Sequence, residues 1–311
     1  MDIILMLLGF GLLVIGGEFL VRASVALSCK LNISKMVIGL TVVSFATSFP
    51  ELLVSLKATL NEAPSIAINN VIGSNIANIG LVLGITALLG TINVGKTFYK
   101  IFWPTLMIFS FVLYYFLDND LKLDAVEGTV LFLSLLLFIA YSLKQSDGAE
   151  IDDSIDVLTT ISNFKIIIWL IIGGGALYFG AQWLVDGAVA IAQKTGVSEA
   201  VISVSIIAVG TSIPELAASV VAMLRKEKAI SLGNLIGSNI FNIGSVLGLT
   251  ALVKPVVVDD PEILSRDILW MLVFAGLLLP LTLFFKRHEI KKLEGFLLVF
   301  LYGIFIYSVF F

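Results

Sequence analysis

Ten long apolar stretches, separated by short polar breaks, dominate this chain of 311 residues. Each is close to or longer than the length of about 20 residues that a helix needs to cross a bilayer. Lipid offers no hydrogen-bond partners, so a single apolar run can satisfy its backbone polar groups there only as a helix. We therefore predict an all-α polytopic membrane protein. Its ten transmembrane helices should cover residues 2–23, 34–60, 66–90, 99–117, 125–143, 164–193, 198–224, 229–253, 263–285 and 293–310.

The composition excludes several other classes of protein. Hydrophobic residues make up 59% of the chain and charged residues 14%, whereas a soluble domain carries about 25% charged residues. A net charge of −4 provides no basic surface for nucleic acid. Cys29 and His288 are the only residues of their types, which excludes an internal disulfide and a thiolate metal cluster. The sequence predicts neither a soluble enzyme nor a nucleic-acid-binding protein, and it implies no obligatory protein partner.

The basic residues predict the orientation of the chain in the bilayer. With ten spans, 14 of the 19 Lys and Arg residues fall on one side, which the positive-inside rule assigns to the cytoplasm. Both termini should then lie outside. Loop 144–163, which holds five acidic residues, should lie in the cytoplasm as a solvated linker. Such short loops favour a prokaryotic plasma membrane. The first span contains Glu18 and Arg22, and their spacing predicts a pair on one helix face.

An internal repeat relates the two halves of the chain. The segment Thr47-Ser48-Phe49-Pro50-Glu51 returns as Thr211-Ser212-Ile213-Pro214-Glu215, and we call the shift from Thr47 to Thr211 the repeat offset. At the same offset, the segment 73–80, Gly-Ser-Asn-Ile-Ala-Asn-Ile-Gly, returns at 237–244 with one change. Over residues 47–88, 24 of 42 positions are identical to their counterparts. The identity is strongest at polar residues, which indicates a shared function rather than shared packing alone.

The repeat predicts the organisation of the chain. The first repeat should cover residues 1–143, with its motif region at 39–90, and the second residues 164–311, with its motif region at 203–254. Each then holds five helices, and an odd number of spans forces the second repeat to enter the membrane upside down. Inverted repeats of this kind build the two equivalent gates of many secondary transporters around one site near the bilayer midplane.

Two glutamates in the middle of predicted spans point to the chemistry of that site. Glu51 and Glu215 each follow a proline, and neither has a basic residue nearby in the sequence. An acidic residue at membrane depth is costly and marks a functional site by default. Proline lacks an N–H and clashes with the carbonyl four residues before it. We therefore expect each helix to kink or break just before the glutamate and to release carbonyl oxygens.

Further oxygen atoms accompany the two carboxylates in both repeats. Hydroxyl groups precede each proline, and a serine and an asparagine four residues apart share one face of the following helix. Such a mixture of carboxylate, carbonyl, hydroxyl and amide oxygens suits hard cations such as Ca²⁺. The neutral candidates are Thr47, Ser48, Ser74 and Asn78 in the first repeat and Thr211, Ser212, Ser238 and Asn242 in the second.

The paired Thr-Ser-x-Pro-Glu and Gly-Ser-Asn-Ile-x-Asn-Ile-Gly motifs resemble the two alpha-repeats of the sodium/calcium exchanger family, within the cation/calcium antiporters. The resemblance is to the short prokaryotic members, because loop 144–163 leaves no room for a regulatory domain. It implies Ca²⁺ ligation by the side chains of Glu51 and Glu215 and the backbone oxygens of Thr47 and Thr211. It implies Na⁺ sites that add Ser74, Ser238 and backbone oxygens near Ser44 and Ala208.

Two departures from the family pattern affect the ions. Related members often carry aspartate at the position of Asn242, and in potassium-dependent relatives that aspartate is linked to K⁺ coupling. The asparagine here weakens the case for K⁺ dependence and removes a possible protonation site. In addition, Ser44-Phe45-Ala46-Thr47 stands where relatives commonly have Ala-x-Gly-Thr, as the second repeat does.

We hypothesise that the chain is a secondary active Na⁺/Ca²⁺ antiporter that works by alternating access, with no resident cofactor. The alternative within the same superfamily is an H⁺/Ca²⁺, or other divalent cation, antiporter. A cation channel would instead carry flux without a counter-ion. An intramembrane hydrolase is disfavoured, because the spans contain no Ser/His pairing, no His-Glu-x-x-His motif and no paired aspartates.

Overall fold

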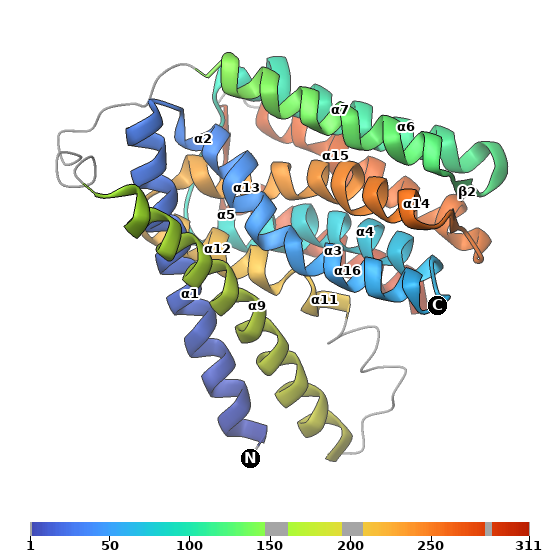
Figure 1. The fold of residues 1–311 in the computed structure, drawn as a ribbon, viewed down its shortest axis with the longest axis horizontal. Helices are drawn as coiled ribbons and strands as arrows, with labels where there is room; N and C mark the ends of the chain where they lie inside the picture. The colour runs from blue at the N-terminus through green and yellow to red at the C-terminus, as the bar shows by residue number, and fades with distance from the viewer. Residues whose placement is uncertain (1, 147–160, 195–207, 284–287, 311) are drawn as a thin grey trace. The chain divides into compact units, whose positions relative to one another are not determined.

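The computed structural model describes residues 2–146, 161–194, 208–283 and 288–310, and most of them are helical (Figure 1). The α-helices are α1 (Asp2–Leu31), α2 (Lys35–Ile38), α3 (Ser44–Leu60), α4 (Ser65–Ala77), α5 (Gly84–Leu89), α6 (Trp103–Asp120), α7 (Ala125–Lys144), α9 (Asn163–Lys194), α11 (Ala208–Gly210), α12 (Ile213–Leu224), α13 (Lys228–Phe241), α14 (Gly248–Val253), α15 (Ile268–Leu283) and α16 (Lys292–Phe310). The π-helical segments are η1 (Gly39–Val43), η2 (Asn78–Leu83), η3 (Phe98–Phe102), η5 (Asn242–Leu247) and η6 (Ile263–Asp267).

The all-α membrane architecture predicted from the sequence is confirmed. Within the described residues, 9 continuous helical stretches are long and apolar enough to cross a membrane, and α12 is a shorter apolar helix. The predicted span 198–224 begins among residues outside the described part and ends with α12. The acidic residues of loop 144–163 also lie outside the described residues.

The first helix is longer than the predicted span 2–23. Helix α1 continues to Leu31 and ends where Asn32 takes a left-handed conformation with φ of 53°. Asparagine is one of the few residues that adopt this conformation readily. The residues between 23 and 31 include no proline or glycine, so the polar side chains there interrupt the apolar pattern but not the helix.

The chain divides into two compact units, and each contains parts of both sequence repeats. The first unit comprises Met1–Thr47 and Ser146–Asn234, and the second comprises Ser48–Gln145 and Leu235–Phe311. Neither repeat is therefore a compact body by itself.

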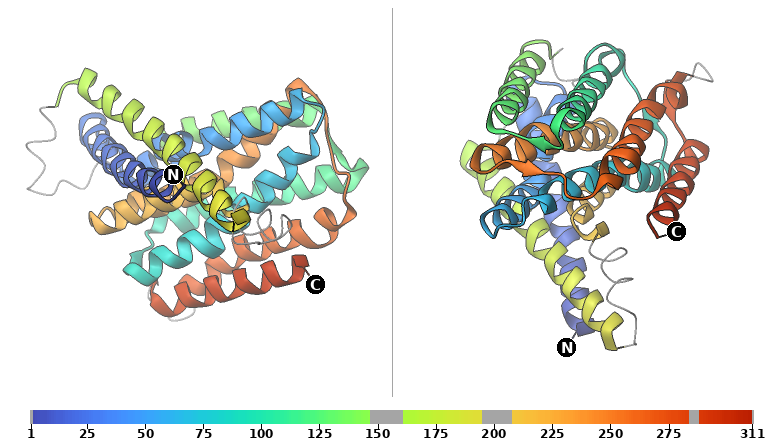
Figure 2. Two further views of the ribbon diagram at one scale, coloured as in Figure 1. Left: turned by 90° about the horizontal axis from the view of Figure 1, so that it is seen from below. Right: turned by 90° about the vertical axis from the view of Figure 1, so that its right-hand side faces the viewer.

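In the first unit, α1 and α9 lie side by side along most of their lengths (Figures 1 and 2). Glycines bring the two backbones together. A Cβ atom on Gly16 would lie 2.8 Å from the backbone nitrogen of Leu177, and one on Gly180 would lie 2.9 Å from the backbone nitrogen of Leu13. Gly16 and Gly180 are equivalent in the repeat, so the contact is reciprocal. Small residues of this kind allow close packing between helices in lipid.

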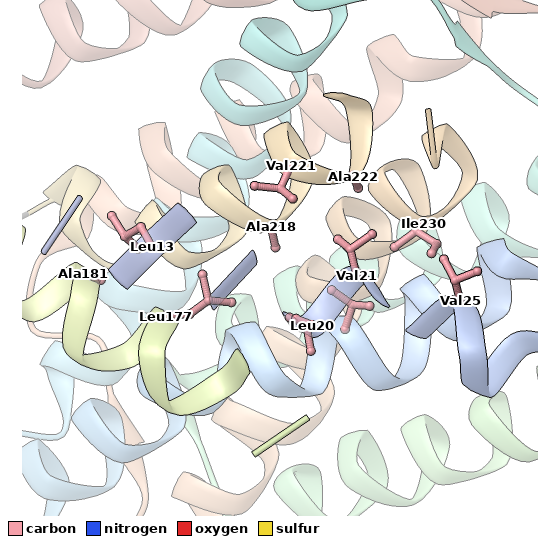
Figure 3. Packing of buried hydrophobic residues seen from close by; sticks show 11 residues of the cluster. Leu13, Leu20, Val21, Val25, Leu177, Ala181, Ala218, Val221, Ala222 and Ile230 are labelled. Carbon is pink, nitrogen blue, oxygen red and sulfur yellow. The ribbon is translucent and has the colours of Figure 1, made fainter. Parts of the chain in front are cut away.

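Apolar side chains from α1, α9, α12, α13 and η1 complete the core of the first unit (Figure 3). Leu20 and Val21 of α1 are almost fully buried, and Leu177 of α9 and Ala218 of α12 pack with them. The contribution of α12 matters for function, because this helix also carries Glu215. Packing against α1 and α9 therefore positions the helix that holds the second intramembrane glutamate.

Ion pairs occur at both ends of this helix group. The predicted pair between Glu18 and Arg22 is confirmed, with 2.5 Å between Oε1 and Nε. The second oxygen of Glu18 accepts from Nε of Arg225 at 2.7 Å, which joins α1 to the end of α12. At the other end of α1, Asp2 pairs with Lys194 of α9.

The second unit is built from pairs of elements that belong to different repeats. Strand β1 (Ile92–Asn93) pairs antiparallel with β4 (Glu289–Ile290), and β2 (Lys122–Leu123) pairs antiparallel with β3 (Val256–Val257). The two ribbons are equivalent, since the repeat offset relates β1 to β3 and a slightly longer offset relates β2 to β4. Each ribbon thus joins the first half of the sequence to the second.

Helix contacts in the second unit also join elements that belong to different repeats. A Cβ atom on Gly84 of α5 would lie 3.0 Å from the carbonyl oxygen of Gly295 in α16. The equivalent Cβ on Gly248 of α14 would lie 3.0 Å from the carbonyl oxygen of Gly128 in α7. Contacts in which equivalent residues exchange places are the signature of a two-fold relation. The repeat in the sequence is therefore a pseudo-two-fold in the packing of each unit.

The glycine packing generates a testable prediction. Changing Gly16 to alanine should lower the melting temperature of the detergent-solubilised protein, because its Cβ meets backbone atoms of α9 at 2.8 and 2.9 Å and overpacking costs about 1–3 kcal/mol. Gly11→Ala on the same helix is the matched control, since a Cβ there meets nothing within 4 Å. Equal melting temperatures for the two variants would contradict this account of the α1–α9 contact.

Candidate cation site

Glu51 lies within the continuous helix α3, and its side chain is fully buried. Of the predicted kink or break, the break is absent in this repeat, because the helix runs through Pro50 without interruption. Pro50 still donates no N–H, so the helix loses one backbone hydrogen bond at this turn. The π-helical segment η1 directly precedes α3, and such segments occur frequently at functional sites.

The second repeat does break at the equivalent position. Helix α11 ends at Gly210, Thr211 and Ser212 form a turn, and α12 begins at Ile213 with a proline in its first turn. The difference has a local cause. Gly210 stands where the first repeat has Ala46, and glycine destabilises a helix by roughly 0.5–1 kcal/mol relative to alanine. Proline alone leaves the helix continuous, whereas glycine and proline together end it.

Glu215 lies in the first turn of α12, and its side chain is fully buried. The N-terminus of a helix carries a partial positive charge and favours a carboxylate there. Ser212 is the N-cap residue of α12, but its hydroxyl makes no capping bond. In the part of the chain that the structure describes, this buried oxygen has no hydrogen-bond partner. Thr211 is only partly buried in the same turn.

In the first unit, Asn234 connects residues of the two repeats. Its Oδ1 accepts from the hydroxyl of Thr47 at 3.1 Å, and its Nδ2 donates to the hydroxyl of Ser219 at 3.1 Å. Ser44 donates to the backbone carbonyls of Asn234 at 2.9 Å and Gly39 at 3.0 Å. Ser219 is four residues after Glu215 and lies on the same face of α12. Asn234 therefore brings Ser44 and Thr47 to the helix face that carries Glu215.

In the second unit, Asn70 makes the equivalent connection for the first glutamate. Its Nδ2 donates to the hydroxyl of Ser55 at 3.1 Å and lies 3.4 Å from the backbone oxygen of Glu51. Ser48 is also buried on α3. The bond from Asn70 to Ser55 matches the bond from Asn234 to Ser219, because the repeat offset relates both partners. Each glutamate helix is thus held by an asparagine from the helix that follows it.

Four asparagines of the second unit form one hydrogen-bond network. Asn75 Nδ2 donates to the backbone carbonyl of Asn239, and Asn239 Nδ2 donates to the backbone carbonyl of Asn75, both at 3.1 Å. Asn78 Nδ2 donates to Oδ1 of Asn239, and Asn242 Nδ2 donates to Oδ1 of Asn75, again at 3.1 Å. All four side chains are buried. We call this group the asparagine network.

The asparagine network leaves two amide oxygens available. Oδ1 of Asn78 and Oδ1 of Asn242 are buried and accept no hydrogen bond from any residue in the described ranges. A buried acceptor without a donor costs about 1–3 kcal/mol, unless a cation occupies its lone pairs. Ser74 and Ser238, one turn earlier on the same helix faces, are buried as well. The predicted serine and asparagine pairs are therefore placed as equivalent sets.

The structure places eleven of the twelve sequence-predicted site residues with their side chains. Ala208 is the first residue of α11, and its side chain lies outside the described part. The first unit holds the candidates Ser44, Thr47, Thr211, Ser212 and Glu215, and the second holds Ser48, Glu51, Ser74, Asn78, Ser238 and Asn242. Each unit therefore contains one of the two glutamates together with polar residues from both repeats.

Sequence reasoning missed three pairs of polar residues that support the candidates. These pairs are Ser55 with Ser219, Asn70 with Asn234, and Asn75 with Asn239. The signal was available, because all six are identical at the repeat offset and all lie in predicted spans. What could not be read from the sequence is that their amides bind one another and the glutamate helices.

The candidate site residues offer a cation only oxygen ligands. Among the described residues there is no group of three or more His, Cys, Asp or Glu side chains that could hold a metal ion. His288 contacts Tyr99, with 3.1 Å between Nδ1 and the phenol oxygen, and Cys29 lies in α1. Carboxylate, hydroxyl and amide oxygens suit hard cations.

Comparison with known proteins decides the family. Residues 1–144 and 165–311 match the sodium/calcium exchanger protein family. The chain belongs to the sodium/calcium exchanger family. The membrane protein MJ0091 of Methanocaldococcus jannaschii is 36% identical over 97% of this chain and 96% of its own length. The sodium/calcium exchanger MaX1 of Methanosarcina acetivorans is 29% identical over 100% of this chain and 99% of its own.

Solved structures agree with this family membership. A structure of the sodium-calcium exchanger NCX_Mj superposes with a TM-score of 0.81 at 32% identity, covering 97% of both chains. The resemblance found in the repeat motifs is thereby confirmed, as is its similarity to short members. This sodium/calcium exchanger family member is an integral membrane protein and an antiporter of Ca²⁺ against another cation.

The geometry of Asn234 gives a second prediction. Asn234→Leu should lower the melting temperature of this family member, because it removes the hydrogen-bond partner of the buried Ser219 hydroxyl and one acceptor of the Thr47 hydroxyl, at about 1–3 kcal/mol. Ser231→Ala on the same helix is the control, since its buried hydroxyl has no partner among the residues described. A larger loss for Ser231→Ala than for Asn234→Leu would disprove the role of Asn234.

Proposed function

We propose that the protein exchanges Na⁺ for Ca²⁺ by alternating access, with Glu51 and Glu215 as ligands shared by both ions. The observation that carries this proposal is the equivalence of the two glutamates. Both are fully buried, both follow a proline, and each is supported by the same asparagine–serine bond at 3.1 Å. The recurrence of a buried, costly carboxylate together with its supporting residues favours a shared role in ion binding.

The ligand set extends to the neutral oxygens around the two carboxylates. Ca²⁺ takes six to eight oxygens, including carboxylate and backbone carbonyl groups. In this proposal Glu51, Glu215 and the backbone oxygens of Thr47 and Thr211 bind Ca²⁺. The Na⁺ ions use the same glutamates with Ser74, Ser238 and the backbone oxygens near Ser44, Thr47, Ala208 and Thr211. Asn78 and Asn242 provide amide oxygens to either ion, and the hydroxyls of Ser48 and Ser212 line the passages to the site.

Competition for the same carboxylates provides the coupling. Two ionised glutamates carry a charge of −2, which one Ca²⁺ or a set of Na⁺ ions neutralises. An empty site would have to move two charges through a low-dielectric core, and the cost of a buried unpaired charge opposes that transition. A ligand shifts the equilibrium between inward- and outward-facing states only by its differential affinity for them. Occupied sites therefore exchange and empty sites do not.

Na⁺ rather than H⁺ is the proposed counter-ion. Asn78 and Asn242 are amides, so they provide neutral oxygens and no titratable group beside the glutamates. The same asparagine at 242 argues against a requirement for K⁺. The proton-coupled alternative keeps the same fold and glutamates but would need protonation of the glutamates themselves for each Ca²⁺ released.

The proposed topology has both termini outside and loop 144–163 in the cytoplasm, in two repeats at 1–143 and 164–311. Contacts within each unit support it, because they join residues assigned to one side. Lys35 pairs with Glu227, and Lys122 of β2 pairs with β3 at Val257. Asp2 with Lys194 and Glu62 with Lys254 are further same-side pairs. The family and the short loops favour a prokaryotic plasma membrane.

Coupling is tested by radiocalcium uptake into proteoliposomes. We expect uptake when vesicles loaded with Na⁺ are diluted into Na⁺-free buffer, with the same rate whether external K⁺ is present or replaced by choline. Vesicles with equal Na⁺ on both sides and an imposed pH gradient should show none. Uptake driven only by the pH gradient would establish proton coupling instead, and uptake without either gradient would indicate a channel.

The glutamates are tested in the same assay. Glu51→Gln and Glu215→Gln should each reduce Na⁺-driven uptake by at least about 100-fold, since removing one buried charge partner from an ion pair costs about 3–5 kcal/mol. Glu62→Gln is the matched control, because this glutamate is 80% exposed and pairs only with Lys254 in the described part. Size-exclusion profiles should match the wild type. Near-normal exchange by either variant would exclude that glutamate as a shared ligand.

A further inference from the structure

The asparagine network contains two residues that are not themselves candidate ligands. Asn75 and Asn239 are each 1% exposed, and their polar groups are committed to protein partners. Nδ2 of each donates to the backbone carbonyl of the other, and Oδ1 of each accepts from the next asparagine along the partner helix. The role of these two residues is therefore distinct from that of Asn78 and Asn242.

The network fixes which end of each amide points where. A backbone carbonyl can only accept a hydrogen bond, so the atom of Asn75 that faces the Asn239 carbonyl must be Nδ2. The other end of Asn75 is then Oδ1, an acceptor, and the atom of Asn242 facing it must be Nδ2. The remaining atom of Asn242 is consequently Oδ1. The same reasoning through Asn239 orients Asn78.

The orientation has a direct consequence for ion binding. An amide can offer a cation its oxygen but never its NH₂ group, and the two ends of an asparagine side chain have nearly the same shape. Without a fixed partner, the Asn78 or Asn242 amide could rotate and present the wrong end. Donation through Nδ2 also polarises the amide and makes its oxygen a better acceptor. Residues that hydrogen-bond to the ligands of a metal ion, without contacting the ion, commonly orient those ligands and tune the site in this manner.

The position of the network in the helices adds a second observation. The π-helical segments η2 and η5 begin at Asn78 and Asn242. The oriented amides thus lie where each helix departs from α-helical geometry, and π-helical turns of this type are frequent at functional sites. Their oxygens are the buried acceptors without a donor among the residues described.

We propose that Asn75 and Asn239 are positioning residues of the cation site, which hold the oxygens of Asn242 and Asn78 toward the transported ion. The proposal rests on the function proposed above, because it takes Asn78 and Asn242 as ligands. The action is crossed between the repeats. Asn75 acts on Asn242 of the second repeat, and Asn239 acts on Asn78 of the first. Each half of the sequence therefore controls a ligand that belongs to the other half.

The test measures the KM for Ca²⁺ and the maximal rate of Na⁺-driven uptake in proteoliposomes. Asn75→Leu, which is close to asparagine in size, should raise the KM about tenfold, the lower end of the effect expected for outer partners of a metal site. The maximal rate should change less than threefold. Thr86→Val is the control for loss of a buried polar group in the same unit, because its hydroxyl donates only to Val82 of its own helix in the described part.

A double-mutant cycle separates positioning from a merely structural role. Residues that act through one another give non-additive effects. Asn75→Leu should therefore have less than a threefold effect on KM when Asn242→Leu is already present. In an Asn78→Leu background it should retain its tenfold effect, because the side chain of Asn75 binds the other ligand, Asn242. Additive effects in both backgrounds would overturn the proposal.

Binding is measured separately from transport through the Ca²⁺-induced rise in melting temperature of the detergent-solubilised protein. A ligand that binds the folded state raises this temperature by an amount that grows with its affinity. We expect a smaller Ca²⁺-induced rise in Asn75→Leu than in the wild type. A lower temperature without Ca²⁺ but an unchanged rise would show a structural role and overturn the proposal.

Failure of this inference can be distinguished from failure of the proposed function. If the wild type shows no Na⁺-driven uptake, the proposed coupling is wrong, and the Ca²⁺-induced thermal shift still tests positioning. If the wild type exchanges and Asn75→Leu has an unchanged KM, only the positioning role is wrong. If Asn75→Leu does not fold, the double-mutant cycle is run with Asn239→Leu and Asn78→Leu, because Asn239 binds Asn78 in the equivalent way. If neither leucine variant folds, the residues hold the helices together rather than orient ligands, and the proposal is overturned.

Discussion

The reciprocal amide bonds between Asn75 and Asn239 are the interaction around which the candidate residues of the second unit are arranged. Each side chain donates to the backbone of its equivalent residue at 3.1 Å, as expected where a two-fold relation brings a residue against its own copy. In lipid, association between helices gains nothing from the hydrophobic effect, so small residues and interhelical hydrogen bonds hold helices together. The glycine contacts of both units and the two strand ribbons show the same reciprocity.

Departures from the symmetry are concentrated around the glutamates and at the ion pairs of Glu18 in α1. The helix continues through Pro50 in the first repeat and breaks before Pro214 in the second. Ser44 donates to Asn234, while its equivalent, Ala208, has no hydroxyl. Glu18 binds both Arg22 and Arg225, and its equivalent is Gln182. The two halves therefore share candidate ligands but differ in backbone continuity and in surface ion pairs.

Much of this structure was predictable from the apolar stretches and the repeat. The stretches reflect the thickness of the bilayer, and the repeat reflects the equivalence of the two halves. The length of each span follows from bilayer thickness, and the repeat offset located both glutamates and their companions. The sequence also predicted the Glu18–Arg22 pair from local spacing. Local propensity was a weaker guide. The polar residues at 24–30 suggested an end to the first span, yet α1 continues to Leu31.

Two kinds of feature were beyond sequence reasoning. The first is the balance between proline and its neighbours, where Ala46 and Gly210 decide between a continuous and a broken helix. The second is the partner of each buried amide. Asn70, Asn75, Asn234 and Asn239 were visible as repeated residues, but an asparagine in a span can bind its own helix, a neighbour or an ion. Only three-dimensional packing distinguishes these possibilities.

The two strand ribbons, which join the first half of the sequence to the second, affect how such a protein is synthesised and folds. β1 pairs with β4 and β2 with β3, so neither strand of the first half has its partner until residues 256–257 and 289–290 have been synthesised. The first five helices must therefore be made before these strands can pair. The fold of the nascent chain stays incomplete until the second half has been synthesised.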